Sequence, residues 1–244
     1  MSKRRPFAVF DIDGTIIRWQ LYHAIADELA KTGHIDANLF EQARAARMEW
    51  KKRVGDDAFK DYEHILVDIY DKALVTLTAD DFMAAVRHVF DEYKEQTYTY
   101  TRDLIQELKS KNYLLFAISA SQEEVVEMLA DYYGFDAWAG SEYPRRGNYF
   151  TGEKVPLKRD LKVKTLQEFV KKFGAASIGS IAVGDSDSDI PMLDTVDQPI
   201  AFNPDKKLFH HAQERGWKIV LERKNMVYEL EPKNGSYVVA QTNA

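Results

Sequence analysis

Two carboxylates end a short apolar run near the N-terminus of the chain. The apolar residues 7–10 are followed by Asp11, Asp13, Gly14 and Thr15, in the order Asp-Ile-Asp-Gly-Thr. Continuous apolar residues predict a strand buried on both faces, and ligands of open α/β sheets bind beyond the carboxyl ends of such strands. Side chains two positions apart begin on the same side of an extended chain, so the two carboxylates can act together. Taken alone, the pair is weak evidence for chemistry, because aspartates commonly cap turns.

A second strand end carries hydroxyl groups. Residues 113–118 form another continuous apolar run, which ends at Ser119 and Ser121, and residues 123–133 follow with the pattern of a helix. Hydroxyl donors and the free N–H groups of a helix N-terminus therefore meet at one place, which suits an anion. An ordinary serine cap of the helix fits the same pattern.

A third strand end is rich in aspartate. Residues 180–183 predict a buried strand, and Asp185, Asp187 and Asp189 follow it in alternation. The spacing also opens a calcium-binding EF-hand loop, but that loop needs glycine at its sixth position, where this chain has Ile190. The calcium interpretation is therefore excluded.

One lysine has an unusual position. Lys162 begins a predicted helix in which Leu166, Phe169 and Val170 lie four, seven and eight positions later, so all four side chains share one side of the helix. Most lysines are solvated surface residues, and Lys164 stays an alternative for any role given to Lys162.

The elements that must position these residues fall into two blocks. Apolar residues recur at helical spacing in four segments, namely 20–31, 38–53, 57–75 and 79–95. No strand pattern interrupts residues 20–96, so we predict an all-helical domain at 18–99, inserted into a core formed by 1–17 and 100–244. The predicted fold is α/β, a mostly parallel sheet with helices on both faces, plus this inserted domain.

Other predicted elements of the core carry no candidate catalytic residues. Residues 142–151 read as a hairpin that could act as a flap over a cleft. Apolar segments at 199–202 and 217–221 continue the sheet, with a helix at 205–215 between them, and the last twenty residues form short strands.

Composition limits the classes of function. The formal net charge of −6 and the pI near 5.6 disfavour a nucleic-acid partner, whose phosphates would need neutralising. The absence of cysteine excludes disulfides, thiolate catalysis and sulfur-bound zinc, so any metal must have oxygen or histidine ligands. No apolar segment has the length of a membrane span or the features of a signal peptide, and we expect a cytoplasmic protein with no membrane partner. The oligomeric state is left open.

In combination, these motifs resemble those of the haloacid dehalogenase (HAD) superfamily. The resemblance covers residues 7 to about 222, and it rests on the Asp-x-Asp-Gly-Thr string, the strand-end serine, the lysine and the Gly-Asp-x-x-x-Asp string at 184–189. Helices between the first and second motifs are similar to those of the branch that includes phosphoserine phosphatase. The resemblance implies a Rossmann-like core and a helical cap.

The resemblance also implies catalytic roles. Asp11 is the expected nucleophile, which forms an aspartyl phosphate, and Asp13 is the expected general acid and base. Ser119 is expected to bind a phosphoryl oxygen, and Lys162 to neutralise charge on the phosphoryl group. Thr15 is expected to orient Asp13 and belongs to the substrate-binding set.

A magnesium site is implied in the same way. Asp11, Asp185 and the main-chain carbonyl of Asp13 are the expected ligands of Mg²⁺, and Asp189 completes the metal group from outside the direct ligands. An acidic site without cysteine suits this ion, which prefers oxygen ligands.

One departure from the family bears on the substrate. In phosphoserine phosphatases, a glutamate five residues beyond the threonine of the first motif is associated with the amino group of the substrate, and this chain has Gln20 there. A neutral amide lacks the charge that makes such a contact strong. An alternative is that Gln20 only begins the cap helix and faces solvent.

The predicted function is Mg²⁺-dependent hydrolysis of a small phosphorylated metabolite. One alternative is a phosphomutase or phosphotransferase that uses the same aspartyl phosphate but passes the phosphoryl group to an acceptor other than water. Release of inorganic phosphate distinguishes these enzymes. Another alternative is a non-catalytic module that binds phospho-ligands or proteins.

Overall fold

The structure is a computed structural model that describes residues 4–55 and 58–243. Its described residues divide into two compact units. The first unit runs to Gln20 and continues with Tyr93–Ser141 and the residues from Pro156 on, whereas the second comprises Leu21–Glu92 and Glu142–Val155. The predicted division placed residues 142–155 in the core, but they group with the helices. Asp57, where the third predicted helix was expected to begin, lies outside the described residues, as do residues 1–3 and 244.

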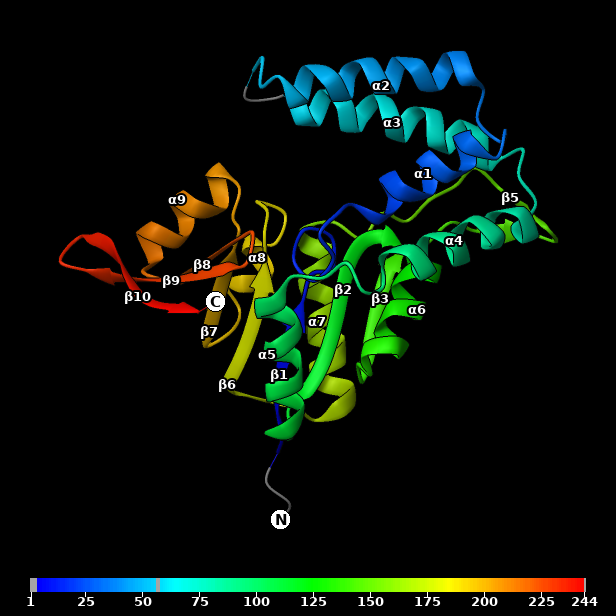
Figure 1. Cartoon of the computed structure of the whole chain (residues 1–244). Coiled ribbons are helices and arrows are strands. Elements are labelled where there is room, and N and C mark those ends of the chain that lie inside the picture. The colour runs from blue at the N-terminus through cyan, green and yellow to red at the C-terminus, as the bar shows by residue number, and fades with distance from the viewer. Residues whose placement is uncertain (1–3, 56–57, 244) are drawn as a thin grey trace. The chain divides into compact units, whose positions relative to one another are not determined.

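The first unit is built on a mostly parallel sheet (Figure 1). Among the described residues it has eight strands in the order β10-β9-β8-β7-β6-β1-β2-β3, and only β9 and β10 pair antiparallel to their neighbours. The strands are β1 (Pro6–Phe10), β2 (Leu114–Gln122), β3 (Ala137–Ser141), β6 (Ala176–Gly184), β7 (Gln198–Phe202), β8 (Lys218–Arg223), β9 (Met226–Lys233) and β10 (Ser236–Asn243). The predicted α/β fold is confirmed.

The apolar run at the N-terminus forms the middle of this sheet. β1 lies between β2 and β6, with Ala8 opposite both Leu115 and Ile181, and most of its side chains are fully buried. The ring of Phe7 stacks on Phe116 at 5.7 Å between centroids. A central parallel strand is covered on both faces, which is why its sequence is continuously apolar rather than alternating.

Five helices connect the strands of the described first unit. They are α5 (Thr99–Ser110), α6 (Glu123–Tyr133), α7 (Asp160–Phe173), the single-turn α8 (Ile190–Leu193) and α9 (Lys206–Arg215). α6, α7 and α9 each end at a glycine in the left-handed conformation, which places the next strand directly after the helix. β3 was not predicted, because four of its five residues are small and its three central residues are only half-buried, which leaves no clear pattern.

The C-terminal segment differs from the prediction of short strands. β9 and β10 are eight residues each and form a long hairpin. Its turn contains Asn234 and Gly235, both with positive φ, which matches the twist of hairpin strands. The Asn-Gly turn therefore indicates this hairpin, whereas the polar composition of its strands does not.

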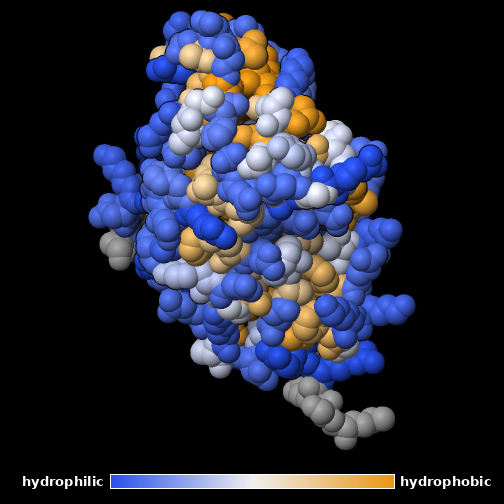
Figure 2. Space-filling view, turned by 90° about the vertical axis from the view of Figure 1, so that its right-hand side faces the viewer, coloured by the Kyte–Doolittle hydropathy of each residue, from blue (hydrophilic) through white to orange (hydrophobic). Residues whose placement is uncertain are grey.

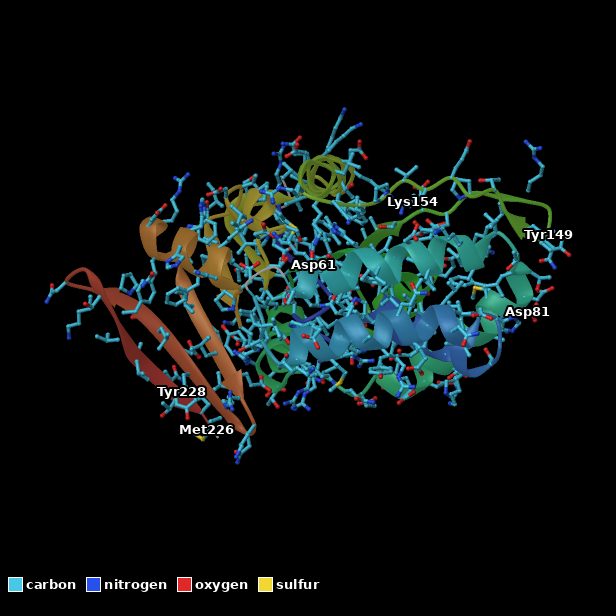
Figure 3. All side chains as sticks on the ribbon, turned by 90° about the horizontal axis from the view of Figure 1, so that it is seen from above. Asp61, Asp81, Tyr149, Lys154, Met226 and Tyr228 are labelled. Carbon is cyan, nitrogen blue, oxygen red and sulfur yellow. The ribbon has the colours of Figure 1, made fainter. Side chains whose placement is uncertain are left out.

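The second unit contains four helices among its described residues, and a small hairpin. The helices are α1 (Leu21–Lys31), α2 (Ala37–Lys51), α3 (Ala58–Leu74) and α4 (Ala79–Tyr93), and the hairpin pairs β4 (Arg145–Arg146) with β5 (Tyr149–Phe150). The ring of Phe150 meets Phe82 edge to face at 5.1 Å, and Ala79 N donates to Asn148 O at 2.8 Å. Figure 3 shows Tyr149 of the hairpin near the end of α4 that carries Asp81.

One face of the molecule shows how polar and apolar residues are distributed over the surface. Figure 2 shows a face on which hydrophilic residues predominate and apolar residues gather in small patches. No helix of the described residues is long and apolar enough to cross a bilayer.

Candidate active site

A glycine lies where the loop after β1 contacts the loop after β6. Gly14 has a φ of +78°, a conformation that side-chain-bearing residues rarely adopt. A Cβ at this position would lie 2.1 Å from Oδ2 of Asp185, so the carboxylate of Asp185 would have to move. Both the positive φ and this close approach therefore favour glycine where the first motif meets the third.

A buried lysine joins two of the predicted aspartates. Nζ of Lys162 lies 2.8 Å from Oδ1 of Asp11 and 2.7 Å from Oδ1 of Asp189. The lysine is only 1% exposed, although it is one of the largest side chains of the chain. Lys164, two positions later on α7, is exposed. Of the two alternatives, the structure brings Lys162 alone into the group of aspartates.

Burial perturbs the charges of this group. Burial raises the pKa of Asp11 to about 7, against the attraction of Lys162, and the neighbouring carboxylates of Asp189 and Asp13 raise it further. Burial likewise raises the pKa of Asp185, with help from Asp11 and Asp189. Burial disfavours the charged form of Lys162, but its two carboxylate partners outweigh that effect and its pKa is raised. The site therefore holds more negative charge than one lysine balances.

Asp189 is fixed by the loop that contains it. Its Oδ2 accepts from the backbone N–H of Asp185, from the N–H of Ser186 and from the hydroxyl of Ser186, each at 3.2 Å. A Cβ at Gly184 would lie 2.6 Å from Cβ of Asp189, so this glycine is also required by close approach. Asp189 is thereby aimed at Lys162, and Ser186 is a supporting residue that sequence reasoning missed.

Asp187 lies outside this arrangement. Its carboxylate accepts from Lys207 at 3.2 Å and pairs with Arg159 at 3.4 Å, both exposed side chains. Asp187 therefore lies apart from Asp185 and Asp189, the two aspartates that the Gly-Asp-x-x-x-Asp spacing names.

Three carboxylates converge tightly enough to bind a cation. One oxygen from each of Asp11, Asp185 and Asp189 lies within 4.8 Å of the others. A set of carboxylate oxygens fits a hard divalent cation such as Mg²⁺. The side chain of Asp13 is not part of this set, and the metal role predicted for its main-chain carbonyl stays a prediction.

Asp13 is instead paired with the predicted phosphate-binding serine. The hydroxyl of Ser119 donates to Oδ2 of Asp13 at 2.6 Å, and the backbone N–H of Ser121 donates to Oγ of Ser119 at 2.9 Å. All three residues are buried. The ends of β1 and β2 thus place a hydroxyl and a carboxylate in direct contact.

Thr15 and Gln20 are placed differently from each other. Thr15 is fully buried, and its carbonyl accepts from the hydroxyl of Thr101 on α5 at 2.8 Å. Sequence reasoning missed Thr101, because nothing local distinguishes it from other helix residues. Gln20 is half-buried at the position before α1, and its contact with a substrate stays a prediction.

Comparison with known proteins supplies the family. Residues 8–194 match the family model of haloacid dehalogenase-like hydrolases. The chain belongs to this family. The superfamily resemblance of the motifs and the prediction of an enzyme are confirmed.

Relatives and solved structures of this family cover most of the chain. It is 26% identical to a histidinol-phosphatase of Neisseria meningitidis serogroup C (strain 8013), over 88% of this chain and 98% of the relative. It is 21% identical to a phosphoserine phosphatase of Streptococcus thermophilus (strain ATCC BAA-250 / LMG 18311), over 83% and 86%.

Two solved structures share its fold. A protein of unknown function from Bordetella pertussis Tohama I has a TM-score of 0.71 at 22% identity, over 89% of this chain and 98% of that one. A phospho-aspartyl intermediate analogue of phosphoserine phosphatase has a TM-score of 0.63 at 19% identity, over 91% and 95%. At these identities the likeness concerns the fold.

Proposed function

We propose that the protein is a Mg²⁺-dependent phosphomonoester hydrolase that acts on a small phosphorylated metabolite through an aspartyl phosphate. The observation that carries this proposal is Lys162, a fully buried cation held 2.8 Å from Asp11 and 2.7 Å from Asp189. A buried ion pair of this kind rarely adds net stability, so a catalytic use is the better account of it.

In the first step, an oxygen of Asp11 attacks phosphorus and the ester oxygen leaves. Asp13 gives the leaving oxygen its proton, which makes it a neutral alcohol. In the second step, water gives a proton back to Asp13 and its oxygen attacks the same phosphorus, which releases inorganic phosphate and restores Asp11. The hydrogen bond from Ser119 holds the carboxylate of Asp13 at the end of β2, beside the path of the proton.

The remaining groups stabilise charge. Lys162 is fixed before reaction, so it can face a phosphoryl oxygen without reorganisation. Ser119 can donate to a second phosphoryl oxygen when its hydroxyl turns from Asp13 to the substrate. Asp11, Asp185 and the main-chain carbonyl of Asp13 would hold Mg²⁺, with Asp189 orienting Lys162. The ion supplies charge neutralisation between the anionic nucleophile and the phosphate dianion.

The relatives narrow the substrate class. Phosphoserine and histidinol phosphate, the substrates in the relatives' names, are both phosphate esters of primary alcohols that carry an amino group. Gln20 provides no charge for such an amino group. We therefore propose a small phosphomonoester, without strong selection for the amino group.

The test is a screen of phosphorylated metabolites with Mg²⁺, read out as inorganic phosphate. Phosphate release that stops when the metal is chelated supports the proposal. Transfer of the phosphoryl group to an acceptor other than water, without phosphate release, would identify a mutase or phosphotransferase. Binding of a phosphorylated metabolite without turnover would identify a non-catalytic module. In either case the hydrolase proposal fails.

Substrate selection is tested separately. We expect kcat/KM for phosphoserine and for its des-amino analogue to differ by less than about a hundredfold, near 2.7 kcal/mol. A larger preference for phosphoserine would contradict the proposal of weak selection for the amino group.

A further inference from the structure

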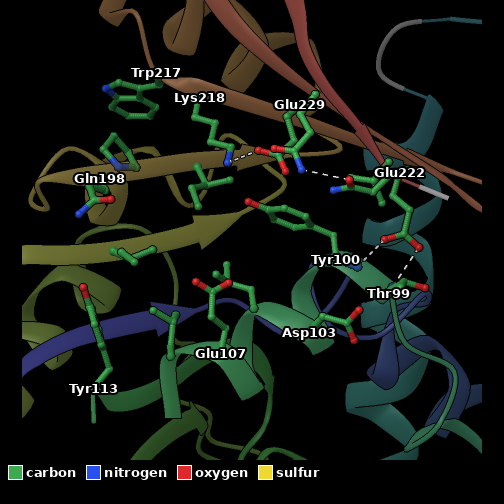
Figure 4. A pocket seen from close by; sticks show the side chains of 18 of the residues that line it. Thr99, Tyr100, Asp103, Glu107, Tyr113, Gln198, Trp217, Lys218, Glu222 and Glu229 are labelled. Carbon is green, nitrogen blue, oxygen red and sulfur yellow. Dashed lines mark hydrogen bonds and ion pairs between the residues drawn. The ribbon is translucent and has the colours of Figure 1, made fainter. Parts of the chain in front are cut away.

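The first turn of α5 has no cap of its own. Tyr98, the residue before the helix, makes no side-chain hydrogen bond to it, although the first N–H groups of a helix have no partner within the helix. Glu222 on β8 supplies the missing partners. Its Oε1 accepts from Thr99 N at 3.0 Å and its Oε2 accepts from Tyr100 N at 2.9 Å, across more than 120 positions of the chain (Figure 4).

Glu222 is itself held in place. It is 7% exposed, and its backbone N–H donates to the side-chain oxygen of Asn203 at 2.8 Å. The N–H of Asn203 in turn donates to the carbonyl of Val220 at 2.8 Å, which ties the end of β7 to β8. A negative charge at a helix N-terminus is favourable, and bonds from N–H groups to a carboxylate are among the stronger ones.

Ring contacts pack part of this side of the helix. The ring of Tyr100 stacks on Phe202 of β7 at 5.8 Å between centroids, and Nζ of Lys218 on β8 lies 5.6 Å from the centre of the same ring. Beside them, a cleft of about 1030 Å³ is lined by α5 and by residues of β6 to β10, with Asp103 and Glu107 on the helix side and Lys218 on the strand side (Figure 4). The carboxylate of Glu222 crosses from β8 to the helix at one end of this cleft. In addition to these ring contacts, the two hydrogen bonds of Glu222 link the backbone of the first turn of α5 directly to β8.

The same turn contacts the loop of the first motif. The hydroxyl of Thr101 donates to the carbonyl of Thr15 at 2.8 Å, and both residues are fully buried. Just before the helix, Tyr98 N donates to Ile16 O at 3.0 Å. Thr15 lies two residues beyond Asp13, so a shift of the turn would be passed to the carboxylates of the site.

We propose that Glu222 is a positioning residue for the loop of residues 11–17, and that it acts through the first turn of α5 and Thr101. The proposal rests on the proposed phosphatase function for its effect on rate, but not for its effect on the loop. Glu222 contacts neither the carboxylate group nor Ser119, and its effect on the site is exerted through backbone positions. Misplacement of reacting groups by a distant substitution can cost up to about a hundredfold in rate.

The experiment compares Glu222→Ala and Glu222→Gln with a matched loss of a helix cap elsewhere. Asp36 caps α2 in the second unit by accepting from Asn38 N at 2.9 Å and Leu39 N at 3.1 Å, so Asp36→Ala is the control. Glu222→Gln keeps the shape and one acceptor oxygen, which guards against a variant that fails to fold. Each protein is assayed for kcat, KM, thermal midpoint and hydrogen exchange of the peptide that contains residues 11–17.

We expect Glu222→Ala to lower kcat about tenfold or more with little change in KM, and Glu222→Gln to lower it less. Exchange in residues 11–17 becomes faster in both variants. Asp36→Ala lowers the thermal midpoint but changes neither kcat nor exchange in this loop. If the Glu222 variants lose thermal stability alone, as the control does, Glu222 is only a cap and the proposal is overturned.

A double-variant cycle tests the route through α5. With Thr101→Val, which removes the hydroxyl and keeps the shape, the combined loss in kcat is expected to be no greater than the larger single loss, because both act on one contact. Full additivity would overturn the route through Thr101. If no phosphomonoester is hydrolysed, the proposed function fails, whereas unchanged exchange of the loop in Glu222→Ala defeats the positioning proposal by itself.

Discussion

Both units of the protein bury polar side chains, but they do so in opposite electrostatic states. In the first unit, Lys162 is a buried cation that forms ion pairs with Asp11 and Asp189. In the second unit, His23 is fully buried among aromatic rings, with Tyr22 at 4.3 Å and Tyr62 at 5.0 Å between centroids. The hydroxyl of Tyr62 lies 3.4 Å from Nδ1 of His23.

The difference appears in how each unit responds to burial. Burial lowers the pKa of His23 to about 3, assisted by the charge of Arg47, so the ring stays neutral. The aspartates of the site retain a cationic partner instead, and three of their oxygens converge on one point. Burial of a polar group alone therefore does not indicate chemistry. A buried ion pair at the ends of strands does indicate chemistry, because such a pair rarely regains the free energy that its charges lose on leaving water.

The largest expected effect is that of a substitution at Asp11, the proposed nucleophile. Asp11→Asn keeps the shape of the side chain and removes its ability to attack phosphorus, so we expect phosphate release to fall by about a thousandfold or more. Circular dichroism checks that the fold persists. A variant that retains more activity than this would contradict the covalent mechanism.

The lysine provides a matched pair on one helix. Lys162→Met removes a buried charge between two carboxylates, and we expect kcat to fall about a hundred- to a thousandfold. Lys164→Met, two positions later on the exposed side of α7, should leave kcat within about twofold of wild type. Equal losses would mean that the burial of Lys162 is structural, like that of His23.

The loop of residues 185–189 allows buried and exposed aspartates to be compared within one segment. Asp185→Ala removes a member of the carboxylate group, so activity should fall and the Mg²⁺ concentration needed for half-maximal rate should rise. Asp187→Ala removes only exposed ion pairs and should change either value little. Titration of the rate with Mg²⁺ measures both, and equal losses in Asp185→Ala, Asp187→Ala and Asp189→Ala would show that the loop is misassigned.

The last expected effect is on stability and its pH dependence in the second unit, not on the reaction rate. The folded pKa of His23, about 3, lies below its ordinary value of 6.5, so below about pH 6.5 the unfolded chain binds a proton that the folded chain does not. Its contribution is present in full above pH 6.5 and is lost as the pH falls toward 3, at no more than about 1.4 kcal/mol per pH unit. Urea unfolding of wild type and His23→Gln should show a shallower acid dependence in the variant. Parallel curves would indicate that His23 is already charged in the folded state.

Local sequence determined the strand ends and the residue types on them. The apolar runs before Asp11, Ser119 and Asp185 require burial on both faces, and a parallel sheet is the structure that provides it. Because parallel strands share one carboxyl edge, the three motifs were expected to meet, and they do. The spacing of apolar residues along α7 likewise favoured Lys162 over Lys164.

Tertiary structure alone decided the partnerships between distant positions. The contact of Glu222 with Thr99 spans 123 positions, and no periodicity or turn signal in either segment points to the other. The grouping of residues 142–155 with the helices also depends on packing, through contacts such as that of Phe150 with Phe82. Local patterns encode which side of an element is buried, whereas the choice of partner across the chain is made by the shape and charge of surfaces that exist only after folding.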